Sequence, residues 1–437
     1  MLSIYGKILK ISRCNPNAFI VNVVLIILTV NSCQFGKQVK QSQVELEGGF
    51  VLDWDNLTYA IAYEHDKFYS LIGIRALTMV HLAMHDALNA IEPQYEQYAY
   101  LQKHDDADPL VAASQAAYEV LIKIYPSRKD TIILQLNKCL KQVAESSAKK
   151  SGIEIGINVA KAIIHLRQGD GHEKQDGYTP MTKPGDYQYT PGWNNWVLKP
   201  DFSYATPFAL DTVTQFRSPD PPNLTSEIYT KSYEEVKAYG MKSSTVRSLD
   251  QTHYAHWWAE FAEHSWNRIG RIAAKKHHLS AWEAARMFAL INVDIYDIYL
   301  ASLESKYFYD TWRPYTAIRE ADSDNNPQTI PIKSWEPEML TPPWPEYPSA
   351  HAAVGAGGAE ILRHVFGTSA ISFTMESTSA LPQAKTRTYN SLIKAADDCA
   401  DSRIMNGYHF RFATEEGKRQ GLQIAKFVHG KILKPLD

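Results

Sequence analysis

The chain has 437 residues, of which 45% are hydrophobic, 21% charged and 11% aromatic. This composition is typical of a globular protein and excludes a disordered chain, a collagen and a small disulfide scaffold. The 45 Lys and Arg residues nearly balance the 48 Asp and Glu residues, so the formal net charge of −3 gives no electrostatic reason to expect a nucleic-acid partner. The cysteines lack the close spacing of a zinc site or a disulfide framework: Cys14, Cys33, Cys139 and Cys399.

The first 33 residues have the order of a secretory signal peptide. Lys7, Lys10 and Arg13 precede a mostly apolar stretch that ends at Val30. With about 12 residues, this stretch is too short to span a bilayer as a permanent helix. We therefore expect that residues 1–33 direct export of the protein.

Cys33 follows Val30-Asn31-Ser32, which resembles a bacterial lipobox, in which the cysteine is lipidated and becomes the first residue of the mature protein. Asn31 is an unusual residue in that motif. The expected location is the periplasm, or the outer membrane or cell surface with a lipid anchor on Cys33. An ordinary cleaved signal and an uncleaved anchor are the alternatives. Residues 34–50 are polar and predict a tether.

The remaining chain divides into three parts by composition. Residues 51–168 have apolar residues at helical spacing, and His81 and His85 within them are more typical of a packed core than of a metal site. Residues 169–252 are rich in Gly, Pro and aromatic residues and predict an ordered cover over a cleft. Helical spacing resumes in residues 253–437. Because no extended stretch alternates apolar with polar residues, we expect an all-α fold packed as helical bundles.

Polar clusters that could carry chemistry occur in the last third of the chain. Lys306 and Arg313 are seven residues apart, or two helical turns, so both side chains are expected on one helix face. Ser349-Ala350-His351 follows a Pro-rich stretch and precedes a run of small residues, which predicts a helix start. The free N–H groups and the hydroxyl at such a start can bind an anion.

A third cluster contains Arg403 and His409, which are close enough at one helix end to converge on one ligand. Each cluster alone is weak, because cations at helical spacing usually form a solvated face. Together they supply three cations, a hydroxyl, helix-start N–H groups and two histidines. This set predicts a receptor for a tetrahedral oxyanion.

In this order the clusters resemble the signature of the family that unites vanadium-dependent haloperoxidases with type 2 phosphatidic acid phosphatases (PAP2) and bacterial acid phosphatases. That signature is Lys-x6-Arg-Pro, then Pro-Ser-Gly-His, then Ser-Arg-x5-His-x3-Asp. The first block is complete here, whereas Ala350 replaces the Gly and Ala413 replaces the Asp. Residues 79–89 and 297–319 also resemble the bacterial haloperoxidase-like branch. The resemblance implies two four-helix-bundle-like halves, with the catalytic bundle in residues 253–437.

The resemblance also implies vanadate as the cofactor, with phosphate able to occupy the same site. His409 would be the axial ligand of vanadium, and His351 would be the acid–base group on the opposite side. The vanadate oxygens would be bound by a set of donors: Lys306, Arg313, Ser349, Ala350 and Arg403. The implied reaction is the oxidation of a halide by hydrogen peroxide to a hypohalous species, without a haem. Leu303 and Trp344 occupy positions that would border the halide, and an apolar, aromatic wall there favours iodide or bromide over chloride.

Two other functions remain open. A soluble periplasmic phosphatase for small phosphomonoesters would use His409 as the nucleophile, forming a phospho-histidine, and His351 to protonate the leaving group. Ala413 counts against it, because the family's phosphatases orient the nucleophile with an Asp there, although another carboxylate or a carbonyl could replace it. The second is a non-catalytic oxyanion-binding relative. The oligomeric state is not predicted by the sequence.

Overall fold

The structure is a computed structural model that describes residues 46–67, 71–175, 177–379 and 384–436. The predicted signal and the residues of the lipobox, Cys33 included, lie outside these residues. Residues 45–437 form one compact unit. Cys139 and Cys399 are both buried and unpaired with one another.

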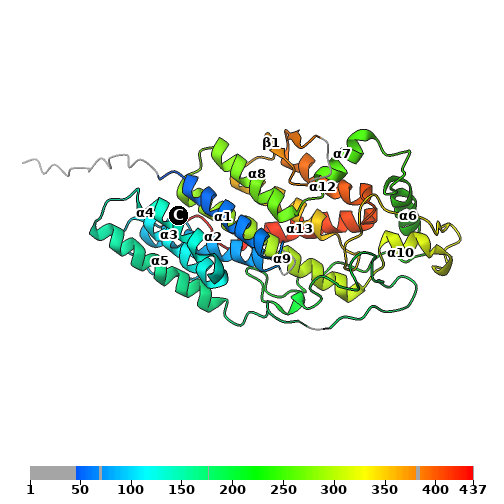
Figure 1. Ribbon diagram of the computed structural model, residues 1–437, viewed down its shortest axis with the longest axis horizontal. Coiled ribbons are helices and arrows are strands. Elements are labelled where there is room, and N and C mark those ends of the chain that lie inside the picture. The colour runs from blue at the N-terminus through cyan, green and yellow to red at the C-terminus, as the bar shows by residue number, and fades with distance from the viewer. Residues whose placement is uncertain (1–45, 68–70, 176, 380–383, 437) are drawn as a thin grey trace, which may run out of the picture. The chain divides into compact units, whose positions relative to one another are not determined.

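Five α-helices and one short 3₁₀ turn precede the loop-rich part of the chain. They are α1 (Gly49–Asp66), α2 (Ile72–Ile91), α3 (Pro109–Ile124), η1 (Pro126–Arg128), α4 (Lys129–Leu140) and α5 (Ser147–Leu166). Asp108 and Ser146 begin α3 and α5, because each side chain accepts a hydrogen bond from a backbone N–H of the first turn. Helix α2 is buried almost throughout and packs against α1, α3 and α5 (Figure 1).

His81 and His85 on α2 are both core residues with protein partners. His81 Nε2 lies 3.0 Å from Asp55 Oδ1, and His85 Nε2 lies 3.0 Å from the carbonyl oxygen of Glu96. Among the described residues, no group of three or more His, Cys, Asp or Glu side chains could hold a metal ion. These contacts explain the two histidines by packing and hydrogen bonding.

The segment that follows α5 is mostly loop but includes η2 (Phe202–Tyr204), α6 (Glu227–Tyr239) and α7 (Leu249–Trp257). Asp297 fixes this segment to the helical body, because its buried carboxylate accepts hydrogen bonds from three successive backbone N–H groups, those of Phe208, Ala209 and Leu210. These hydrogen bonds hold residues 208–210 of the segment against α9.

The last part of the chain forms a second helical bundle. Its helices are α8 (Ala262–Lys276), α9 (Ala281–Tyr309), α10 (Pro314–Arg319), η3 (Ala321–Ser323), α11 (Ala350–Phe366), α12 (Leu392–Met405) and α13 (Arg411–Lys431). Helix α9 packs against α11 and α13 and also against α2, so it belongs to both bundles. Small residues let α11 and α13 approach closely: a Cβ on Gly421 would lie 2.0 Å from the carbonyl oxygen of Ala353.

The all-α expectation is confirmed for the body of the fold, with one addition. Strands β1 (Phe373–Glu376) and β2 (Thr386–Tyr389) form an antiparallel pair in which Phe373 lies opposite Tyr389. Each strand has only four residues. Alternation over so short a length does not stand out in a sequence, and contacts with α8 and α12 support the pair.

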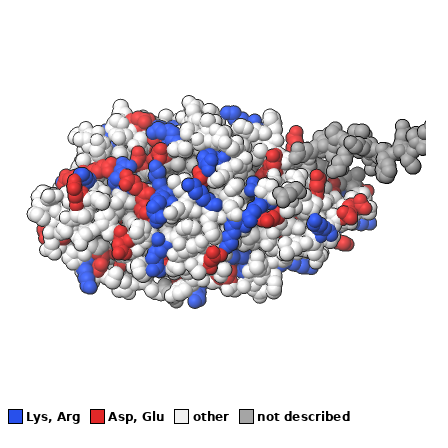
Figure 2. All heavy atoms as spheres, turned by 180° about the vertical axis from the view of Figure 1, so that it is seen from behind, with Lys and Arg blue, Asp and Glu red and all other residues white. Residues whose placement is uncertain are grey.

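The surface mixes both signs of charge. Figure 2 shows Lys and Arg interspersed with Asp and Glu over the face opposite to that of Figure 1. Within the described part of the chain, none of the helices combines the length and the apolar character needed to cross a membrane.

Candidate active site

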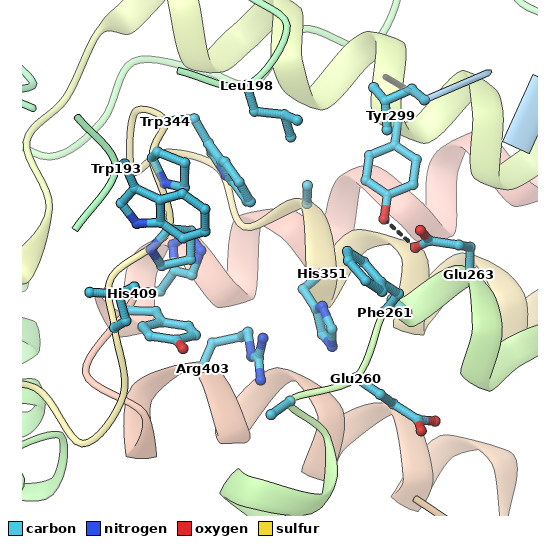
Figure 3. Close-up of a pocket in the computed structure, with 18 residues that line it drawn as sticks. Trp193, Leu198, Glu260, Phe261, Glu263, Tyr299, Trp344, His351, Arg403 and His409 are labelled. Atoms are coloured by element: carbon cyan, nitrogen blue, oxygen red, sulfur yellow. Dashed lines mark hydrogen bonds between the residues drawn. The ribbon is translucent and has the colours of Figure 1, made fainter. Parts of the chain in front are cut away.

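Residues of the second and third polar clusters line one pocket, with a volume of about 220 Å³, and Arg313 of the first cluster contacts the pocket residue His409. Ala350 and His351 from α11, Arg403 from α12, and His409 from the turn before α13 line it. Figure 3 shows His351, Arg403 and His409 around this pocket, with Trp344 beside them. Residues from stretches up to about a hundred positions apart are therefore brought together, as the oxyanion-site prediction requires.

Lys306 and Arg313 converge on the site, but not from one helix face as the spacing predicted. Helix α9 ends at Tyr309, and Asp310 takes a left-handed backbone conformation with φ 48°. Arg313 then precedes α10, whose first residue is Pro314. A proline ring fits at the start of a helix and not inside one, so Pro314 favours this break.

Both cations are held by the Pro-rich loop that precedes α11. Lys306 Nζ donates to the carbonyl oxygens of Pro345 and Glu346, at 2.9 and 2.8 Å. Arg313 Nε donates to the carbonyl oxygen of Trp344, at 2.7 Å. Both side chains are fully buried. The loop therefore fixes the two cations that the sequence assigned to the oxyanion.

Helix α11 begins at Ala350, with Ser349 as its N-cap. The Ser349 hydroxyl accepts a hydrogen bond from the N–H of Ala352, at 3.4 Å. Ala350 is the first helical residue, so its Cβ meets no torsional strain. Replacement of Gly by Ala in the second block therefore leaves the backbone N–H group of residue 350 at the helix start.

His351 faces the pocket from the first turn of α11. Its Nε2 is buried and has no hydrogen-bond partner among the described residues. Burial and the nearby Arg403 guanidinium hold the pKa of His351 well below its usual range. The imidazole is therefore neutral and able to accept a proton.

Arg403 lies in the last turn of α12, where Nη2 donates to the carbonyl oxygen of Trp258 (3.0 Å) and Nε to the Ser402 hydroxyl (3.1 Å). Helix α12 ends at Met405, and the following turn brings His409 back to the pocket. The expected convergence of Arg403 and His409 at one helix end is thus what the structure shows.

Two contacts determine the tautomer of His409. Its Nε2 lies 3.0 Å from Arg313 Nη1, and a guanidinium can only donate, so Nε2 must accept. Its Nδ1 lies 2.9 Å from Glu346 Oε1 and donates to that carboxylate. The lone pair of His409 is therefore on Nε2. Burial and the cations Arg313 and Lys306 hold the pKa of His409 well below its usual range, so the imidazole is neutral.

Glu346 is the functional residue that the sequence analysis missed. It is completely buried, and its Oε1 also accepts the backbone N–H of Phe410, at 3.0 Å. A carboxylate is rare in a fully buried position. The available signal was an acidic residue enclosed by apolar and proline residues, five positions before His351. None of the three blocks of the family signature includes position 346.

The site has an excess of positive charge. Lys306 and Arg313 lie near the carboxyl group of Glu346, whereas the carboxyl groups of Glu260 and Glu263 line the pocket elsewhere. Burial lowers the pKa of Lys306, and burial lowers the pKa of Arg313 to about 10. Burial raises the pKa of Glu346 to about 7, against the opposing effect of Lys306 and Arg313. A bound anion would offset the cost of burying these cations.

The unpaired atoms fit a tetrahedral oxyanion such as vanadate or phosphate. Arg313 Nη2 and His351 Nε2 are buried and have no partner among the described residues. A cation about 4 Å from an oxyanion contributes on the order of 4 kcal/mol at an effective dielectric constant near 20. Arg313 Nη2 thus offers an anion a donor, and His351 Nε2 offers an acceptor for a proton that the anion carries.

The walls of the pocket away from the cations are apolar and aromatic. Trp344 lines the pocket, together with Trp193 and Leu198 from the cover segment. Leu303 is buried in α9 and is not among the lining residues. Of the two positions expected beside the halide, Trp344 alone contacts this cavity in the described part of the chain.

Comparisons with known proteins agree with this architecture. Residues 286–437 match the family described as the VCPO second helical-bundle domain. The vanadium chloroperoxidase of Curvularia inaequalis is 24% identical over 373 residues, which cover 68% of this chain and 61% of the relative. The chain therefore spans less than two thirds of the length of this curated relative.

Two solved structures share the fold. A structure described as the first bacterial vanadium-dependent iodoperoxidase has a TM-score of 0.78 and 23% identity, and the match covers 91% of this chain and 100% of that one. A bacterial vanadium-dependent chloroperoxidase in its holo form has a TM-score of 0.68 and 17% identity, covering 82% of this chain and 91% of that one. The resemblance expected from the sequence is thereby confirmed: the chain has the helical fold of the vanadium-dependent haloperoxidases, and its last third matches their second helical-bundle domain.

Proposed function

We propose that this protein is a vanadate-dependent haloperoxidase, which uses hydrogen peroxide to oxidise a halide to a hypohalous species. The observation that carries the proposal is the arrangement of His409. Its unprotonated Nε2 accepts a hydrogen bond from Arg313 Nη1, and its Nδ1 contacts the Glu346 carboxyl group, in a buried site near Lys306 and Arg403. A nitrogen lone pair beside an anion receptor is suited to an oxyanion whose central atom accepts an axial ligand.

Lys306, Arg313 and Arg403 would hold the oxygens of vanadate, with the Ala350 N–H at the start of α11. Bound vanadate would act as a Lewis acid that activates hydrogen peroxide, without haem. His409 would hold the vanadium through Nε2, the nitrogen that carries the lone pair. Trp344 and the cover residues would exclude water from the opposite wall.

His351 would handle the protons of the reaction. The balanced equation combines hydrogen peroxide, one halide ion and one proton to give one hypohalous acid and one water, so the halide is oxidised by two electrons and the peroxide is reduced. The neutral Nε2 of His351 has no protein partner and can accept a proton from peroxide and return it to the leaving oxygen.

The aromatic wall favours a large halide. Iodide and bromide are weakly hydrated, so they lose less on entering a pocket lined by Trp344, Trp193 and Leu198 than chloride does. We therefore propose iodide or bromide as the substrate. Turnover of purified, vanadate-loaded protein with each halide is the test, and preferential oxidation of chloride would contradict the proposal.

A phosphatase remains the second candidate because of Glu346. The argument against it was the absence of a carboxylate at position 413, and Glu346 supplies a carboxylate to His409 Nδ1 from another element. One assay separates the functions: halide oxidation by vanadate-loaded protein beside hydrolysis of p-nitrophenyl phosphate by vanadate-free protein. Oxidation alone supports the haloperoxidase, and hydrolysis inhibited by vanadate supports the phosphatase. Absence of both activities would contradict both and support a non-catalytic oxyanion-binding relative.

We also propose export, with lipidation at Cys33, from the order of basic and apolar residues and cysteine in the first 33 positions. Cell fractionation with mass spectrometry of the mature N-terminus is the test. A mature chain that begins at a lipid-modified Cys33 is expected, and a cytoplasmic chain that retains its first residues would contradict export.

A further inference from the structure

Glu346 joins the first and third polar clusters, although no motif position includes it. Its backbone N–H donates to the carbonyl oxygen of Thr311 at 2.9 Å, and its own carbonyl oxygen accepts Lys306 Nζ. Its Oε1 accepts both the Nδ1–H of His409 and the N–H of Phe410. Hydrogen bonds thus hold both the backbone and the carboxylate of Glu346 in place beside His409.

Glu346 attracts Lys306 and Arg313 electrostatically but forms no direct ion pair with either of them in the described structure. Lys306 and Arg313 each donate to loop carbonyl oxygens, and the ion-pair contact of this carboxylate in the described structure is with His409. Its second oxygen, Oε2, is buried without a partner among the described residues. The carboxylate is therefore directed at the imidazole.

We propose that Glu346 is the positioning residue for His409, and that it performs from the loop before α11 the function that the family signature assigns to an Asp at position 413. Ala413 lies at the start of α13, and its carbonyl oxygen accepts the Ser349 N–H at 3.0 Å. The carboxylate–imidazole pair is thus present, with its acidic member in the loop before the second block instead of in the third block.

The consequence is specific to ligands that form an axial bond. By accepting Nδ1–H, Glu346 keeps the lone pair on Nε2 and fixes the plane of the ring. Vanadate readily becomes five-coordinate and would use that lone pair, whereas phosphate held by the same cations forms no stable fifth bond. The negative charge of Glu346 by itself opposes both anions. Loss of Glu346 should therefore weaken vanadate binding and leave phosphate binding unchanged or stronger.

The inference rests on the proposed vanadate site, and its test measures binding instead of turnover. Dissociation constants for vanadate and for phosphate are measured by calorimetry for the wild type, Glu346→Leu and Glu346→Gln. Glu346→Leu is expected to raise the vanadate constant about 10- to 100-fold relative to the phosphate constant. Glu346→Gln can still accept Nδ1–H through its amide oxygen, so a smaller change is expected.

A double-mutant cycle separates positioning from a structural role. In the His409→Ala background, Glu346→Leu should no longer change the ratio of the two constants, because the imidazole that it positions is absent. Asp297→Asn is the matched control: it also alters a fully buried carboxylate that accepts backbone N–H groups, but away from the pocket, and should leave the ratio unchanged.

Three results would overturn the inference. They are an equal loss of both anions in the Glu346 variants, an undiminished effect in the His409→Ala background, and a wild type that binds vanadate no more tightly than phosphate. Failure of halide oxidation with the predicted shift in binding would contradict the haloperoxidase proposal and leave the positioning role supported.

Discussion

Buried arginine and lysine residues occur in two regions of this protein and have different partners in each. Near the N-terminal helices, Arg75 and Arg167 each donate through Nε to the carboxylate of Asp170, at 2.9 Å. In the pocket region, Lys306, Arg313 and Arg403 donate to carbonyl oxygens instead. The two arginines of the first set share one carboxylate partner, whereas no cation of the second set forms an ion pair with a carboxylate in the described structure.

The difference separates buried cations that have a structural role from buried cations that are available to bind a ligand. A buried charge is tolerated when a partner of opposite charge offsets its desolvation. The arginines beside Asp170 meet this condition and need no ligand. The cations of the pocket meet it only when an anion binds. Burial alone therefore does not identify a site. Arg286 is also buried and donates to the carbonyl oxygen of Leu433, so the pocket region is set apart by several such cations gathered near His409.

The largest effect should come from substitution of His409, which the proposed function makes the protein ligand of vanadium. His409→Ala is expected to abolish halide oxidation, because the axial nitrogen is lost, while the fold is retained. Steady-state turnover and circular dichroism of the vanadate-loaded variant are the measurements. Unaltered turnover would show that His409 is not the axial ligand.

The contrast between the two sets predicts effects of different size on the free energy of unfolding. Asp170→Asn should lower the free energy of unfolding by about 3–5 kcal/mol, because two buried arginines lose their anion. Lys306→Met should change it by less than about 2 kcal/mol without ligand, because the desolvation cost of the cation offsets its two hydrogen bonds.

Bound vanadate should stabilise proteins that keep the cations of the pocket more than a variant that lacks one of them. At a hundredfold excess over its dissociation constant, it should stabilise the wild type and Asp170→Asn by about 2.7 kcal/mol, and Lys306→Met much less at the same concentration. Urea unfolding with and without vanadate is the measurement. Equal stabilisation of all three proteins would contradict the division into paired and ligand-dependent cations.

A smaller effect is expected from a buried acid at the far wall of the pocket. Burial raises the pKa of Glu263 to about 7, and Tyr299 donates a hydrogen bond to it at 2.6 Å. The folded state then binds more protons than the unfolded state between pH 4.5 and 7, so wild-type stability falls as pH rises through that interval.

Glu263→Gln should remove that loss, which amounts to ~3 kcal/mol, and should make the variant more stable than the wild type at pH 8. Urea unfolding at pH 5 and pH 8 measures the difference. The same pH dependence in wild type and variant would place the responsible group elsewhere.

The smallest expected effect concerns the apolar wall. Trp344→Ala should reduce the preference for iodide over chloride roughly tenfold, because a hydrophobic contact contributes about 1–3 kcal/mol to discrimination. Trp344→Phe, which keeps an aromatic ring, is the matched control. The measurement is the ratio of kcat/KM values for the two halides, and a preference that survives Trp344→Ala would exclude Trp344 from the halide wall.

Much of the helical fold and most of the oxyanion site could be predicted from residue spacing. Apolar periodicity and the break at Pro314 are local properties, as are the capping serine and small residues around α11. The position of Glu346 could not be predicted in this way. It lies 63 residues from His409 along the chain, and nothing in the spacing indicates that the two side chains touch.

The sequence by itself determined which residue types are available and which short stretches form helices, because those depend on neighbouring residues. The tertiary structure decided that Lys306 and Arg313 meet across a turn instead of along one helix face, and that Trp344 and not Leu303 borders the cavity. The tertiary structure also determined which buried cations lie close enough to a carboxylate to form an ion pair. Such pairings depend on how distant segments pack, and packing geometry is not encoded in local spacing.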